Sequence, residues 1–120
     1  MTTKTLTRVF TRVTLLCWIT IVSGLSIASA DDIADGKKVA FDRKKGNCLA
    51  CHMISDGPLP GNIGPPLIAM KDRFPDKAAL RAQIWDSTVS NPNTIMPPFG
   101  RNRILSEQEV DLVTEFIYSL

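Results

Sequence analysis

The residues best suited to chemistry form one short motif, Cys48-Leu49-Ala50-Cys51-His52. Two thiols separated by two residues fit on a single helical turn, where both can add to the two vinyl groups along one edge of a haem. The imidazole that follows then faces the iron from the same side. This C-x-x-C-H signature predicts one haem that is attached covalently through Cys48 and Cys51, with His52 as an axial ligand.

Two other uses of paired cysteines fit the sequence less well. A structural zinc site needs four protein ligands, but His52 is the only histidine and the third cysteine, Cys17, lies in a segment that we expect to be removed. A redox-active C-x-x-C pair is typical of a βαβ context, and no alternating strand pattern occurs in this sequence. We therefore adopt haem attachment as the interpretation.

The second axial ligand of the iron must be another residue type, because no second histidine exists. Methionine, lysine or an open position remain. Met53 adjoins His52 on the same side of the haem, and Met70 ends a short apolar run that is typical of a core position. Met96 is followed by two prolines, and a residue before proline is held extended, so this stiff loop can present a thioether. We predict Met96 as the ligand, which fills both axial positions and favours electron transfer over O₂ activation.

A backbone carbonyl is expected to orient the imidazole. The segment Gly64-Pro65-Pro66-Leu67 begins twelve residues after His52 and has few competing N–H donors. We predict that the carbonyl of Pro65 accepts the Nδ1–H of His52 and so fixes its tautomer and basicity; a plain loop is the alternative. Four side chains remain open as partners of the haem propionates, with none preferred: Arg73, Trp85, Arg101 and Arg103.

Helices and loops must position these residues. Apolar residues at helical spacing and helix start signals predict three helices, over residues 33–44, 76–85 and 106–120. Pro75 stands where the second helix would start, and Ser106 with Glu109 forms a capping box for the third. Two stretches rich in Gly, Pro and Asn are predicted to be long ordered loops, residues 56–66 and 90–103.

The first thirty residues have the features of an export signal. Three basic residues precede an apolar stretch over residues 13–25, and Ala28-Ser29-Ala30 has the small-x-small pattern of a cleavage site. The apolar stretch is shorter than the ~20 residues that a membrane-spanning helix needs, so an uncleaved anchor is the less favoured alternative. We expect cleavage after Ala30, a periplasmic domain over residues 31–120, and no stable membrane anchor.

Removal of the signal changes the charge of the chain. The full sequence has 14 basic and 12 acidic residues, a formal charge of +2. Three basic residues leave with the signal, so 11 minus 12 gives −1 for the remaining ninety residues. This balance gives no reason to expect nucleic-acid binding. A domain of this size needs a source of stability beyond its own core, and a haem supplies one.

The order of these features resembles the class I cytochrome c family over nearly all of residues 33–120. The shared elements are an N-terminal helix, C-x-x-C-H, Gly-Pro-x-Leu, Met-Pro-Pro and a C-terminal helix. The resemblance implies an all-α fold with three to four short helices wrapped around one covalently bound haem c. In that fold the terminal helices cross at small residues, a role that Gly36 and Ala40 would have against Phe116.

Three segments are similar to a narrower group, the SoxX family of monohaem subunits: GNCLACH at 46–52, GNIGPPL at 61–67 and NPNTIMPPFGRNRILSEQEVDLVTEFIYSL at 91–120. SoxX pairs with SoxA in the SoxAX cytochrome of bacterial thiosulfate oxidation, an L-cysteine S-thiosulfotransferase that conjugates thiosulfate to a cysteine of the carrier SoxYZ. The resemblance implies bond formation on SoxA and electron transfer through this haem to a c-type cytochrome. Carried over by position, Cys48 and Cys51 hold the haem, and His52 and Met96 ligate the iron.

Two functions follow, and both stay open at this point. As a complex subunit, the chain would bind SoxA stably through a partly apolar surface near the haem edge, where residues 96–99 would lie. As a free-standing soluble periplasmic class I cytochrome c, it would dock transiently by surface charge. The loop over residues 91–100 favours the subunit, because it resembles SoxX more than a general carrier.

Overall fold

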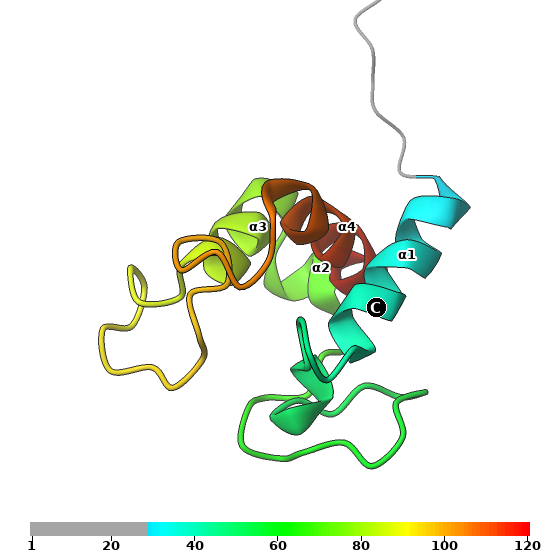
Figure 1. The fold of residues 1–120 in the computed structure, drawn as a ribbon, viewed down its shortest axis with the longest axis horizontal. Helices are drawn as coiled ribbons and strands as arrows, with labels where there is room; N and C mark the ends of the chain where they lie inside the picture. Colours follow the sequence, from blue (N-terminus) through cyan, green and yellow to red (C-terminus); the bar gives the residue numbers. More distant parts are fainter. Residues whose placement is uncertain (1–28) are drawn as a thin grey trace, which may run out of the picture.

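The computed structural model describes residues 29–120, and the predicted export signal lies outside them except for Ser29 and Ala30. The described residues form four α-helices and one 3₁₀ turn, with no strand among them (Figure 1). In chain order the elements are α1 (Ala30–Phe41), η1 (Cys48–Ala50), α2 (Met70–Arg73), α3 (Lys77–Trp85) and α4 (Glu107–Tyr118). The predicted all-α class is confirmed.

Helix α1 starts and ends three residues before the positions that the apolar pattern indicates. In the uncleaved chain a capping box sets its start, since the Ser29 hydroxyl accepts from the backbone N–H of Asp32 and the Asp32 carboxylate accepts from that of Ser29. The predicted cleavage after Ala30 would remove this cap. At the other end Asp42 has an extended backbone, and its carboxylate accepts from the N–H of Lys44 at 2.8 Å. Such a local turn competes with helix continuation, so the helix stops at Phe41.

Helices α1 and α4 pack against each other (Figure 1). Gly36 and Ala40 are buried in this contact, and a Cβ on Gly36 would clash with the backbone carbonyl of Leu112. Next to it the rings of Phe41 and Phe116 meet edge to face, with centroids 5.7 Å apart, a favourable aromatic geometry. The predicted crossing of the terminal helices at small residues is confirmed.

The C-terminal helix α4 has the predicted capping box, because Ser106 and Glu109 accept from each other's backbone N–H groups. Its buried residues recur at spacings of three and four: Val110, Val113, Thr114, Phe116 and Ile117. Burying an apolar side chain of this size contributes about 1.5–3 kcal/mol. This face therefore anchors the helix to the core.

Helix α3 begins after Asp76, whose carboxylate accepts from the N–H of Ala78 at 2.9 Å. Pro75 thus precedes the cap and is not the first helical residue. The short helix α2 was not predicted, because its single turn is too brief to show a helical period. The two predicted loops, 56–66 and 90–103, contain no helix or strand. No helix in the described part of the chain is long and apolar enough to cross a membrane.

Candidate functional site

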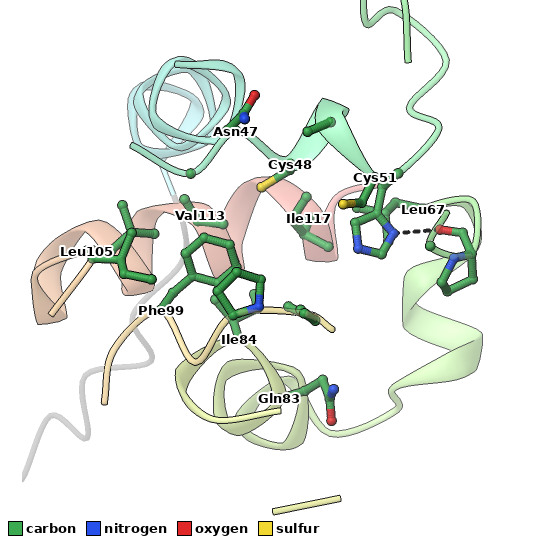
Figure 2. Close-up of a pocket in the computed structure, with 18 of the residues that line it drawn as sticks. Asn47, Cys48, Cys51, Leu67, Gln83, Ile84, Phe99, Leu105, Val113 and Ile117 are labelled. Carbon is green, nitrogen blue, oxygen red and sulfur yellow. Dashed lines mark hydrogen bonds between the residues drawn. The ribbon is translucent and has the colours of Figure 1, made fainter. Parts of the chain in front are cut away.

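A cavity of about 620 Å³ lies between η1, α3, α4 and the loop that follows residue 93 (Figure 2). Eight of its lining residues also belong to the buried core: Leu67, Met70, Leu80, Ile84, Phe99, Leu105, Val113 and Ile117. Its volume is in the range of about 300–1,000 Å³ that is usual for ligand and cofactor sites. An apolar cavity of this size fits a porphyrin.

The two cysteines of the C-x-x-C-H motif lie at the ends of the 3₁₀ turn η1, Cys48 as its first residue and Cys51 directly after its last. Asn47 precedes this turn with φ 47°, and the N–H groups of Cys51 and His52 both donate to the carbonyl of Cys48, at 3.2 and 2.9 Å. Both cysteines are free and half-buried. Figure 2 shows both sulfur atoms facing the cavity. The single turn predicted for the motif is therefore present and turns both thiols inward.

Burial raises the pKa of the Cys48 thiol to about 11, because the charged thiolate is poorly solvated there. Without a bound group the Cys48 thiol is therefore protonated at neutral pH. In residues 29–120 no group of three or more His, Cys, Asp or Glu side chains is placed to hold a metal ion. The described residues thus give no support to the zinc or redox alternatives.

The imidazole of His52 lines the cavity, and its Nδ1–H donates to the carbonyl of Pro65 at 2.7 Å (Figure 2, dashed line). The sequence predicts this bond. A neutral imidazole with its proton on Nδ1 has a free electron pair on Nε2, which is the form that binds iron. A carbonyl partner of this kind fixes the ring and raises its basicity.

The loop that carries Pro65 also holds the ring from the side. A Cβ on Gly64 would lie 2.5 Å from Cε1 and 2.7 Å from Nδ1 of His52. Only glycine allows the backbone to approach the ring this closely. Arg73 braces the same loop, since its Nη1 donates to the carbonyl of Pro66 at 2.7 Å.

Three methionines were considered as the second ligand, and the structure places them differently. Met96 is half-buried and lines the cavity together with His52. Met70 also lines the cavity, but it is fully buried in the core, and Arg73 Nη1 lies 3.4 Å from its sulfur. Met53 is exposed and is not part of the cavity wall. Met96 is thus the methionine that a loop brings to the cavity.

We name residues 86–101, which carry Met96, the methionine loop. The backbone N–H groups of Gly100 and Arg101 close its base by donating to the carbonyl of Trp85, at 3.1 and 3.2 Å. Arg101 Nη1 also donates to Asp86 Oδ2 at 2.9 Å and to Thr88 Oγ1 at 3.0 Å. The pKa of Asp86 is held below its usual range mainly by the Thr88 hydroxyl, which donates to Asp86 Oδ1 at 2.5 Å, then by the backbone N–H of Thr88 and by Arg101.

The four candidates for the haem propionates are not gathered in one place. Arg73 alone of the four lines the cavity. Arg101 is engaged with Asp86, and Trp85 is stacked under the guanidinium of Arg81, 5.5 Å from the ring centroid. Arg103 is exposed with φ 55° and is not part of the cavity wall.

Three consecutive basic residues that the sequence analysis did not single out, Arg43, Lys44 and Lys45, also line the cavity. They lie between α1 and the motif, and the last of them, Lys45, pairs with Glu109. Their position just before C-x-x-C-H was the signal available in the sequence. Arg43 has no acidic partner among residues 29–120.

The comparisons with known proteins agree with this geometry. The family model for cytochrome c matches residues 33–120. Among solved structures the chain is similar to the crystal structure of SoxXA from P. pantotrophus, with 28% sequence identity and a TM-score of 0.65, over 72% of this chain and 79% of that chain. No curated protein matched the sequence. Because the family match spans well over half of the chain and includes the motif and its cavity, the chain belongs to the cytochrome c family, with Cys48 and Cys51 as its haem c attachment site.

Proposed function

We propose that this cytochrome c is the electron-transfer subunit of a SoxXA-like complex. The observation that carries the proposal is the similarity to SoxXA at 28% identity over 72% of the chain. In this role SoxA would conjugate thiosulfate to a cysteine of SoxYZ, and the present chain would pass the electrons to a c-type cytochrome. The predicted export signal supports a periplasmic location for this reaction.

The residues of the cavity suit a haem that transfers electrons. Haem c supplies one-electron chemistry when it is attached. We propose that His52 and Met96 would hold the iron of this haem, a ligand pair that would raise its reduction potential and favour electron transfer. Pro65 holds the His52 ring by its Nδ1–H, and most of the residues around the cavity are apolar.

Exposed apolar side chains at the cavity support docking of a partner subunit. We define the apolar rim as Ile63, Ile95, Pro97 and Ile104, which are all exposed and all line the cavity. Exposed apolar patches mark protein–protein contacts. The prediction that residues 96–99 form this surface is therefore wrong in part. Phe99 is 9% exposed and belongs to the core, whereas Ile95, outside the predicted range, is 74% exposed. In the proposed complex the partner at this rim is SoxA.

The alternative function, a free-standing class I carrier, has one observation in its favour. Arg43 and Lys44 lie at the same cavity, and exposed basic side chains near a haem suit transient docking to an acidic partner. A carrier of this kind would work without a stable complex.

Reconstitution with SoxA distinguishes these functions. We expect thiosulfate- and SoxYZ-dependent reduction of a c-type cytochrome to require this chain, and Ile95→Glu to weaken its binding to SoxA at least tenfold, or about 1.4 kcal/mol. Ile68→Glu is the matched control, because Ile68 is also exposed but lies outside the cavity wall. Full turnover without this chain would rule out the subunit role, and equal effects of the two variants would exclude the apolar rim as the contact.

A further inference from the structure

Ser87 is a buried polar residue that the haem site described so far does not use. It is 0% exposed, and its hydroxyl donates to the backbone carbonyl of Met96 at 2.8 Å. A buried hydroxyl is costly unless it is hydrogen-bonded, so its partner matters. Here the partner is the carbonyl of the methionine that we propose as the iron ligand.

The other polar group of the Met96 backbone is also bound by a hydroxyl. The N–H of Met96 donates to Thr94 Oγ1 at 3.1 Å, and the next residue, Pro97, has no N–H to donate. No backbone-to-backbone hydrogen bond joins Met96 to any other residue within 29–120. Two side-chain hydroxyls therefore satisfy the backbone N–H and carbonyl of Met96, which in a helix or strand would bond to other backbone groups.

Thr114 shows that a buried hydroxyl does not by itself imply a positioning role. Thr114 and Ser87 are the two buried polar residues in the described part of the chain. The Thr114 hydroxyl donates at 2.7 Å to Val110, one turn earlier in its own helix, and so reaches no other element. The Ser87 hydroxyl instead spans the methionine loop, from its start just after α3 to Met96 nine positions later.

We infer that Ser87 is a positioning residue for Met96: together with Thr94 it fixes the backbone of the ligand so that the thioether stays at the cavity. This inference rests on the proposed ligation by Met96. A ligand must be held within about 0.5 Å of its working position to bind well. Loss of the Ser87 hydroxyl frees the Met96 carbonyl and raises the population in which the methionine is away from the iron.

Imidazole binding to the ferric holo-protein measures that population, because an external ligand binds only when Met96 has left. We expect Ser87→Ala to raise the affinity for imidazole about three- to tenfold, the size of effect that the loss of one hydrogen bond produces. Thr94→Val removes the second hydroxyl and is expected to act in the same direction. Thr114→Val is the matched control, which removes an equivalent buried bond and should leave imidazole affinity unchanged.

Two reference variants separate this inference from the ligation on which it rests. Met96→Ala should abolish the methionine-to-ferric-iron charge-transfer absorption and bind imidazole most tightly, whereas Met70→Ala should keep that absorption. If Met96→Ala keeps it, the proposed ligation is wrong. If Met96→Ala loses it but Ser87→Ala and Thr114→Val have the same imidazole affinity, the ligation stands and the role of Ser87 is refuted.

Discussion

Residues 61–67, which we name the histidine loop, carry the hydrogen-bond acceptor for His52, and the methionine loop carries Met96 itself. The first is bound to the motif by a series of backbone bonds, in which Gly61, Gly64 and Leu67 donate to the carbonyls of Leu49, Cys51 and Met53 at 2.7–2.9 Å. Around Met96 the corresponding bonds come from side chains, the hydroxyls of Ser87 and Thr94.

This difference shows which of the two loops depends on the identity of particular side chains. Backbone bonds form with almost any side chain, so the histidine loop depends on residue type at few positions, the closely packed Gly61 and Gly64 and the Arg73 that bonds to Pro66. The methionine loop has backbone bonds at its base, but around Met96 it depends on particular hydroxyls. It also depends on the ion pair between Asp86 and Arg101, and one substitution can remove any of these side-chain contacts. We therefore expect the methionine loop to open at a lower free energy than the histidine loop.

The largest effect is expected on the histidine side, at Gly64, which lies against the imidazole of His52. Gly64→Ala places a Cβ 2.5 Å from the His52 ring, so the ring must tilt and lose its bond to Pro65. Overpacking of this kind costs about 1–3 kcal/mol. We expect a low yield of holo-protein with an altered haem absorption spectrum.

Gly57→Ala is the control for that variant. A Cβ at Gly57 would meet the end of the Leu49 side chain, which can move aside, so a nearly normal yield is expected. Equal losses in both variants would show that close packing against His52 is not what makes Gly64 necessary.

A smaller effect is expected from Arg73, which bonds to the carbonyl of Pro66. Arg73→Gln should loosen the histidine loop and speed exchange of the His52 Nδ1 proton with solvent about three- to tenfold, the effect of one hydrogen bond. The measurement is proton exchange by NMR. Arg43→Gln removes the same charge from the same cavity wall and serves as control. Equal acceleration in the two variants would indicate a general charge effect and not a brace.

The smallest effect is expected from pH, and it concerns the methionine loop. The pKa of Asp86 is lowered by the Thr88 hydroxyl and by Arg101, so its contribution to stability is complete above the unfolded-state value of about 3.9. That contribution is lost as the pH falls through the lower folded-state pKa. We expect the amide of Gly100 to lose protection from hydrogen exchange on acidification before that of Gly64.

Asp86→Asn removes the titrating group and tests this ordering. After correction for intrinsic exchange rates, the variant should show no pH-dependent loss at Gly100 over the acidic range. An unchanged acid response in Asp86→Asn would assign the effect to another carboxylate. Loss of protection at both loops together would contradict the difference in stability between them.

The sequence predicted those parts of the molecule that depend on local signals. The capping box of Ser106 and Glu109 specifies the start of α4, and the proline-rich segment after the motif correctly indicated the bond between His52 and Pro65. These features need only neighbouring residues or a known motif geometry. The bounds of α1 were less accurate, because Ser29 extends the helix beyond its apolar pattern.

Contacts that no motif or family resemblance indicates were not predicted. Ser87 lies nine residues from Met96, and nothing in its own neighbourhood marks it as buried or as bound to the loop. Arg43 comes to the cavity because α1 ends at Phe41 and the chain turns back toward the motif. Helix α2 is a single turn after Ala69, which has φ 49°, and a single turn has no periodicity to detect.

The side chains that wall the cavity are also the core of the domain, as Leu80, Ile84 and Val113 illustrate. Without a haem between them, these side chains cannot pack into a complete hydrophobic core. Biogenesis should therefore follow a fixed order, in which the chain receives its haem while still open and closes around it afterwards. Quality control in the cell would then act at the moment of attachment, since a chain that misses that step remains a substrate for proteases.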